Sequence, residues 1–168
     1  MNEDMEEFML SNKAKDNLKD KKNLQQNLES GKSVLQLMDF QQGTCAKFYQ
    51  AAFKLFQQQN YADAADAFLF LITLDSENHD YWLGLGMSTQ LLHQYEAAID
   101  AYEMAAISKL DSPVPYFYLA KCLYAVHDKE SSLSALNLAI EYSNDELIFQ
   151  DLKNQAIVAR DLLLKDIN

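Results

Sequence analysis

The sequence predicts an all-α protein built from tandem pairs of helices. Large residues recur at a spacing of 34 residues, as in Phe48, Trp82 and Tyr116. Small residues that allow close helix packing recur at the same spacing four positions later, at Ala52, Gly86 and Ala120. Only 4 Gly and 2 Pro occur among 168 residues, which favours long helices joined by short turns. The hydrophobic content of 49% suits one core of ordinary size. We therefore expect a helix-turn-helix solenoid.

A 34-residue period with this alternation of large and small residues is typical of tetratricopeptide repeats. We expect three of them, over residues 45–78, 79–112 and 113–146. A leading N-terminal helix should precede them, and a C-terminal capping helix at about 145–166 should close the open end of the stack. Residues 34–168 would then form one tetratricopeptide-repeat domain.

Residues 1–33 have a different composition and predict a polar, partly disordered N-terminal extension. Six of the 14 basic residues fall here, mixed with acids and amides. Because so little apolar surface is present, this segment should be a frayed tail or a helix that becomes ordered against a partner. An apolar patch follows, which we expect to form a short helix that covers the first repeat or meets a second copy of the chain. The patch comprises Val34, Leu35, Leu37, Met38 and Phe40.

The elements of the repeats follow from local signals. Gln57 to Asn60 should form the first turn, and the second helix of that repeat should begin near Tyr61. Ser112 followed by Pro113 predicts the start of the third repeat. Ser143 and Glu146 have the spacing of a capping box before the final helix. The apolar side of that helix should carry Ile148, Leu152, Ala156, Ala159 and Leu163.

Charge and composition exclude several classes of function. The net charge is -11, and Arg160 is the single arginine, so nucleic acids and anionic membranes would be repelled. The acidic first residues do not resemble a signal peptide, and the longest apolar run, 67–72, is too short to span a bilayer. We expect a cytoplasmic protein in which Cys45 and Cys122 are reduced, mostly buried thiols.

Catalytic and metal-binding patterns are not found in the sequence. His93 and His127 occupy the same place in consecutive repeats, in the expected turn between helices, where histidine tolerates a left-handed backbone. A metal site would need a third ligand at short spacing. No phosphate loop or nucleophile elbow is present, and the carboxylates are scattered over solvated helix faces. We therefore expect no enzyme, no cofactor and no metal.

The concave face of the repeat stack is the strongest candidate site. In tetratricopeptide proteins the second, fifth, ninth and twelfth residues of each first helix face inward. Here these positions are mostly apolar, with Lys121 the one basic residue, so an apolar, extended ligand is favoured over an acidic tail. The alternative is that the terminal helix or the N-terminal segment folds into the groove. The inward positions are Ala46, Tyr49, Phe53 and Phe56, then Asp80, Leu83, Met87 and Gln90, then Val114, Phe117, Lys121 and Tyr124.

The stretches at 81–86, 94–99 and 113–123, which read YWLGLG, QYEAAI and PVPYFYLAKCL, resemble the class II translocator chaperones of bacterial type III secretion. This SycD/LcrH-like tetratricopeptide-repeat family also has three repeats, a leading helix and a capping helix. The resemblance implies a cytoplasmic bacterial chaperone that keeps hydrophobic translocator proteins soluble and secretion-competent until export, and it places family dimer contacts in the N-terminal region.

In that family an extended translocator segment lies in the concave groove. The resemblance places Tyr49, Phe53, Phe56 and Tyr61 among the family's groove aromatics. Leu83, Met87, Phe117 and Tyr124 are added from the geometry of the inward face. The alternative function is a generic tetratricopeptide-repeat scaffold or co-chaperone that organises folded partners through its acidic convex face.

Overall fold

The structure is a computed structural model that describes residues 12–30, 34–38, 43–144 and 146–167. The regular structure of these residues is entirely helical, which confirms the predicted fold class. Three short helices come first: α2 (Asn12–Lys19), α3 (Lys21–Glu29) and α4 (Val34–Met38). The repeats follow as the pairs α5 (Thr44–Gln57) and α6 (Tyr61–Leu74), α7 (His79–Leu91) and α8 (Tyr95–Ser108), and α9 (Pro113–Ala125) and α10 (Lys129–Tyr142). A short 3-10 helix, η1 (Leu147–Phe149), leads into α11 (Gln150–Ile167).

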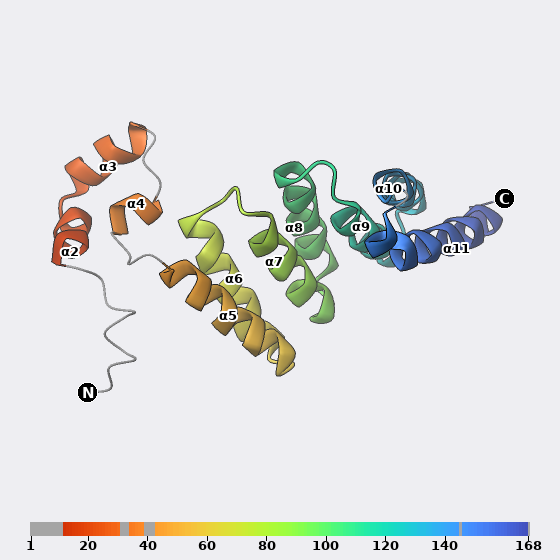
Figure 1. The fold of residues 1–168 in the computed structure, drawn as a ribbon, viewed down its shortest axis with the longest axis horizontal. Coiled ribbons are helices and arrows are strands. Elements are labelled where there is room, and N and C mark those ends of the chain that lie inside the picture. The colour runs from red at the N-terminus through yellow and green to blue at the C-terminus, as the bar shows by residue number, and fades with distance from the viewer. Residues whose placement is uncertain (1–11, 31–33, 39–42, 145, 168) are drawn as a thin grey trace.

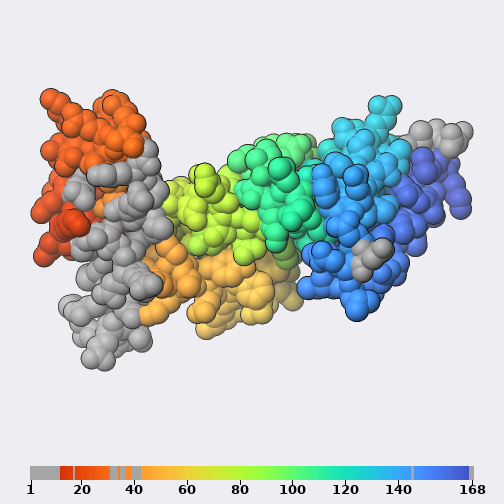
Figure 2. Space-filling model, turned by 45° about the horizontal axis from the view of Figure 1, so that its top comes forward, coloured from red at the N-terminus to blue at the C-terminus, as the bar shows by residue number. Residues whose placement is uncertain are grey.

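The helix pairs follow one another along the long axis of the molecule (Figure 1). The helices α2 to α4 lie at one end, and α11 lies at the other. The space-filling view shows the same succession from orange to blue along an elongated surface (Figure 2). From α5 to α11 each α-helix packs on the next one along the chain, and the first helices of adjacent repeats also touch, α5 against α7 and α7 against α9. This arrangement places the first helices side by side.

The turns inside the repeats share one backbone conformation. Gln59, His93 and His127 stand 34 residues apart and have φ values of 62°, 60° and 66°. After each of them a backbone N–H reaches back across the helix end, as from Asn60 to the carbonyl of Leu55 at 3.0 Å. This left-handed closure satisfies carbonyls that the helix leaves unpaired. The interpretation of both histidines as turn residues is confirmed.

Two glycines in α7 allow the neighbouring helices to approach. A Cβ atom at Gly84 would overlap carbons of the Phe68 ring, which comes from α6. A Cβ atom at Gly86 would lie 2.7 to 3.0 Å from carbons of the Tyr102 ring, which comes from α8. Phe68 belongs to the core of the first repeat, and Tyr102 belongs to the core of the second and third. The small residues of α7 therefore let both cores form around one helix.

The ends of the third repeat show one prediction confirmed and one wrong. Ser112 is the N-cap of α9 and Pro113 is its first residue, as expected. Ser143 does not cap the final helix: it ends α10, and its buried hydroxyl donates to the carbonyl of Ala139 at 2.6 Å. The hydroxyl is used inside α10, and α11 starts later, at Gln150. Ile148 lies in η1, before α11, and is exposed rather than packed.

The described part of the N-terminal region is helical. Ala14 in α2 is buried, whereas α3 has no buried residue. The short helix α4 touches α6, and its Leu37 is buried, so it covers part of the first repeat. The acidic start of the chain and Phe40 lie outside the described residues.

Candidate functional site

The inward-facing positions of the three first helices form one register. The positions Tyr49, Phe53 and Phe56 on α5 recur as 83, 87 and 90 on α7 and as 117, 121 and 124 on α9. Within a helix the spacing of four and then three residues places the side chains on one face. Because α5, α7 and α9 lie side by side, these faces adjoin. The residues predicted to line the groove therefore share one side of the stack.

An aromatic row, made of Tyr49, Phe53, Phe56 and Tyr61, follows α5 and crosses to the start of α6. The ring centroids of Tyr49 and Phe53 are 6.4 Å apart, and so are those of Phe53 and Phe56, with both pairs stacked. Phe56 and Tyr61 continue the row at 5.4 Å. Phe53 is 42% exposed although it is large and apolar. The row gives α5 a continuous, partly exposed aromatic surface.

Tyr49 also has a structural role that the sequence did not reveal. Its ring contacts the core ring of Phe68 at 6.0 Å and the ring of Tyr81 at 5.9 Å. Burial, and to a lesser extent the charge of Asp80, raises the pKa of its phenol. Tyr49 is therefore an edge of the core as well as part of the row, and Phe53 is the more exposed of the two rings.

The inward positions of the middle repeat, on α7, are partly buried by packing. Leu83 and Met87 are half-buried and pack against the core cluster that contains Tyr102 and Phe117. Gln90, which follows Leu83 and Met87 in the inward register, accepts a hydrogen bond from the Tyr102 hydroxyl at 2.7 Å. The surface that α7 presents is consequently less aromatic and more rigidly held than that of α5.

The inward positions of α9 depart in part from the prediction. Phe117 was expected on the inward surface, yet it is buried, with 5% of its area exposed. The ammonium of Lys121 lies 4.3 Å above its ring, and Tyr118 packs edge-on at 5.5 Å. The sequence register gives the direction of the side chain but not these covering groups. Tyr124, at 52% exposure, is open as expected.

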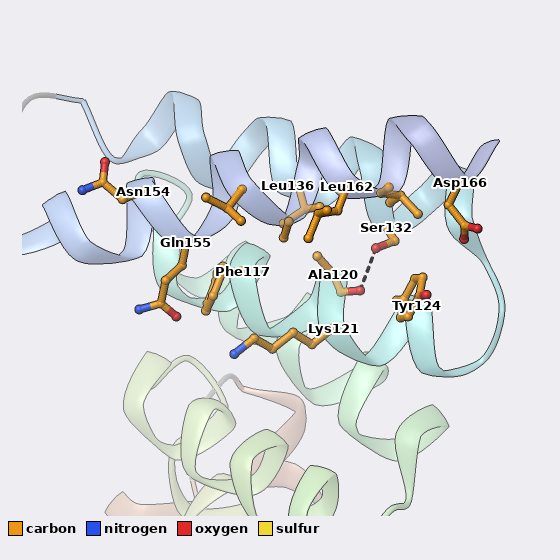
Figure 3. A pocket seen from close by; sticks show the side chains of 13 residues that line it. Phe117, Ala120, Lys121, Tyr124, Ser132, Leu136, Asn154, Gln155, Leu162 and Asp166 are labelled. Carbon is orange, nitrogen blue, oxygen red and sulfur yellow. Dashed lines mark hydrogen bonds between the residues drawn. The ribbon is translucent and has the colours of Figure 1, made fainter. Parts of the chain in front are cut away.

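A cavity of about 680 Å³ lies between α9, α10 and α11, and Phe117, Lys121 and Tyr124 line it (Figure 3). We call it the C-terminal pocket. From α11 it is lined by residues that include Gln155, Val158 and Leu162. The hydroxyl of Ser132 is fixed in its wall by a hydrogen bond to the carbonyl of Ala120 at 2.8 Å.

The sequence predicted that α11 caps the stack, with folding into the groove as the alternative. In the structure α11 lines this pocket together with three inward positions of α9, Phe117, Lys121 and Tyr124. The 3-10 helix begins at Leu147, 34 residues after the first residue of α9. Counting the same spacing onward from Lys121 and Tyr124 leads to Gln155 and Val158, which line the pocket. The 34-residue spacing thus indicated which residues of α11 line the pocket, although their residue types do not follow the pattern of the three repeats. The helix occupies the place of a first helix in a fourth repeat.

Cys45 and Cys122 are both free thiols, and burial raises the pKa of the Cys122 thiol to about 11. In the described part of the chain, no helix has the length and apolarity needed to cross a membrane. Within the same residues, no three His, Cys, Asp or Glu side chains are grouped so as to hold a metal ion.

Comparisons with known proteins agree with the geometry. The family model of the tetratricopeptide repeat matches residues 47–78 and 79–107. The low calcium response locus protein H of Yersinia pestis is 31% identical over 128 residues, which is 76% of each chain. The chain belongs to the SycD/LcrH family of class II type III secretion chaperones. This family is not enzymatic.

Solved structures of the SycD/LcrH family share the fold. The translocator chaperone SycD of Yersinia enterocolitica is 28% identical, with a TM-score of 0.73 over 79% of this chain and 98% of that one. A second SycD structure, in complex with a peptide of the translocator YopD, is 27% identical with a TM-score of 0.74, over 76% and 98% of the two chains. A type III secretion complex from Aeromonas hydrophila has a TM-score of 0.81 over 87% and 97%, at 24% identity, which shows the fold alone.

Proposed function

We propose that this chain binds hydrophobic translocator proteins through the concave face of its first helices. It thereby keeps them soluble and competent for secretion in the bacterial cytoplasm. The bound part is an extended, apolar segment, and the activity is binding without catalysis. The family to which the chain belongs and the SycD structure with a translocator peptide support this function over that of a generic scaffold.

The observation that carries the proposal is the aromatic row. Its four rings form one contiguous apolar patch, in which Phe53 is exposed and the other three rings are partly exposed. Contiguous apolar patches on soluble proteins mark sites that a partner covers. A side chain of the client that is fully buried against such rings contributes about 1.5–3 kcal/mol before ordering costs. Three anchors of this size would give a dissociation constant on the order of micromolar or somewhat better.

The chemistry of the groove also defines its client. The aromatic row contains no ionised side chain, and Leu83 and Met87 continue it with apolar surface. A carboxylate-rich tail would find one cation among the inward positions, Lys121. A segment with spaced apolar side chains therefore fits this surface better than an acidic one.

Co-expression with a candidate translocator, a protein that contains apolar membrane segments, tests the proposal. Phe53→Ser removes an exposed ring from the row, and Leu69→Ser is the matched control, because Leu69 is 50% exposed on α6. We expect Phe53→Ser to lower the soluble yield of the client about tenfold or more, as the loss of one apolar anchor predicts. Leu69→Ser should leave it unchanged.

Equal protection by both variants would contradict the assignment of the groove. Phe53 suits this test better than Tyr49, because Tyr49 also packs against Phe68 and Tyr81 in the core. Circular dichroism of the two purified variants should show the same helical content. A loss of client is then a loss of binding and not of folding.

A further inference from the structure

The C-terminal pocket differs from the core because large apolar side chains on its walls are exposed. Val158 and Leu162 on α11 are 60% and 61% exposed, and Tyr124 on α9 faces them across the cavity. Two helices thus present apolar side chains to the same open space of about 680 Å³. Cavities of this size and lining bind small apolar bodies or single bulky side chains.

The two charged groups that line the pocket are not equivalent. Asp166 forms an ion pair with Lys129, whose ammonium lies 2.7 Å from the carboxylate. Lys121 has no carboxylate within ion-pair distance anywhere in the described part of the chain. Its ammonium lies over the rings of Phe117 and Tyr118, at 4.3 and 5.1 Å. The negative charge is therefore compensated inside the protein, and the positive charge is not.

The two charged groups lie at opposite ends of the pocket. In Figure 3 the ammonium of Lys121 lies at the Phe117 end of the pocket, and Asp166 lies at the Tyr124 end. Partial burial lowers the pKa of Lys121, which reflects the cost of holding the cation there. A bound anion at the Phe117 end would offset that cost. The chain as a whole has a net charge of -11, so this uncompensated positive charge is opposite in sign to the overall charge of the protein.

We infer that the C-terminal pocket is a second anchor site for the client. It takes a bulky apolar side chain from a client segment that places a carboxylate on Lys121. This inference rests on the proposed function and deepens it. The aromatic row selects apolar side chains alone, whereas this site selects an apolar side chain accompanied by an acid.

Continuity with the groove identifies the client as the occupant. Lys121 and Tyr124 stand 68 residues after Phe53 and Phe56, two repeats along the same register. The chain's own helices α2 to α4 lie at the opposite end of the stack from α11 (Figure 1). A segment that runs along the inward face from α5 through α7 arrives directly at this pocket.

A fragment titration tests the chemistry without any client. The probe is 4-phenylbutyrate, which joins an aromatic body to a carboxylate, and 4-phenylbutyramide is its neutral counterpart. Methyl NMR signals of Val158 and Leu162 report binding to the full chain. We expect the carboxylate to bind about three- to tenfold more tightly than the amide, with the difference shrinking at high salt.

Matched variants locate the binding. Lys121→Gln should remove the preference for the carboxylate, whereas Lys109→Gln, on another exposed lysine, should not. Leu162→Ser should weaken both probes, and Ile107→Ser, with a similar exposure of 64%, should weaken neither. Equal affinity for the two probes, or a preference that survives Lys121→Gln, would overturn the inference.

The co-expressed client supplies the second part of the test. Lys121→Glu should lower the soluble yield of the client, while Lys109→Glu should leave it unchanged. If Lys121→Glu abolishes fragment binding but retains the client as well as wild type does, the pocket is not a client site. That result would leave the effect of Phe53→Ser intact, so the failure of this inference is distinguishable from failure of the proposed function.

Discussion

The two ends of the groove use the same repeat positions for different chemistry. At the first position α5 has Tyr49 and α9 has Phe117; at the second they have Phe53 and Lys121. On α5 the rings stack on one another and Phe53 stays partly exposed. On α9 the second residue is a cation that lies over the first ring, which is buried. The repeat therefore determines where a side chain points, and the residue and its covering helices determine what it does.

The neighbouring helices explain much of this difference. The face of α9 is flanked by α11, which lies where the first helix of a fourth repeat would lie. The aromatic row of α5 belongs to the first repeat and is continued by Tyr61 of the next helix. One end of the groove is thus an open aromatic surface, and the other is a walled pocket.

The largest expected effect is on stability, where Phe117 and Phe53 should differ. Phe117→Ala should lower the free energy of unfolding by about 3–5 kcal/mol, because it empties a buried ring site. Phe53→Ala should lower it by about 1 kcal/mol, because that ring is already partly in water. Urea unfolding followed by circular dichroism measures both. Similar losses for the two variants would show that the ends do not differ in burial.

A smaller effect on stability is expected from substitutions of the two glycines of α7. Each glycine lies against a different core, one containing Phe68 and the other containing Tyr102. Gly84→Ala should destabilise the protein by about 1–3 kcal/mol, because the new methyl group meets the Phe68 ring inside the first-repeat core. Phe68 contacts Tyr49, so this variant should also disturb the aromatic row. Gly86→Ala acts on Tyr102 instead, which belongs to the cluster that contains Phe117.

Binding measurements distinguish the two glycine variants. Gly84→Ala should weaken retention of the co-expressed client at temperatures where it remains folded, and should leave 4-phenylbutyrate binding near the wild-type value. Gly86→Ala should show its larger effect on the fragment. If each variant affected both readouts equally, the groove would respond as one unit and the distinction between its ends would fail.

The sequence was sufficient for the scaffold because the 34-residue period encodes it in many residues. The helix pairs follow from the spacing, and the resemblance to tetratricopeptide repeats adds the turn positions of His93 and His127 and the inward register. The burial of Phe117 and the core contacts of Tyr49 could not be predicted in the same way. They depend on which side chains from other helices lie over the ring, and a period within one helix does not contain that information.

The errors at Ser143 and Ile148 have a related cause. The spacing of Ser143 and Glu146 fitted a capping box, in which the serine oxygen accepts a hydrogen bond from a backbone N–H. Instead, the hydroxyl of Ser143 lies at the end of α10 and donates to the carbonyl of Ala139. Local patterns of this kind compete with the helix that has already formed. The capping-box spacing therefore did not locate the start of α11, whereas the 34-residue repeat count does locate its pocket-lining residues Gln155 and Val158.

The smallest expected effect concerns the turns of the second and third repeats. Both turns have a histidine at the same position, but the contacts of the two side chains differ. His93 and His127 share a left-handed backbone, which costs an L-residue roughly 1–2 kcal/mol. The ring of His93 recovers part of this through a 2.8 Å hydrogen bond with the Tyr95 hydroxyl. The exposed side chain of His127 makes no such bond to the residues that the structure describes.

His127→Gly should therefore stabilise the protein by about 0.5–1 kcal/mol, the strain relieved less the chain entropy that glycine adds to the unfolded state. His93→Gly should gain less, because it also removes the bond to Tyr95. Thermal unfolding of the two variants at one protein concentration makes the comparison. A larger gain at His93 than at His127 would mean that the Tyr95 contact does not support the turn. The turn before α8 would then owe its stability to the packing of the helices and not to the contact of the residue at its left-handed position.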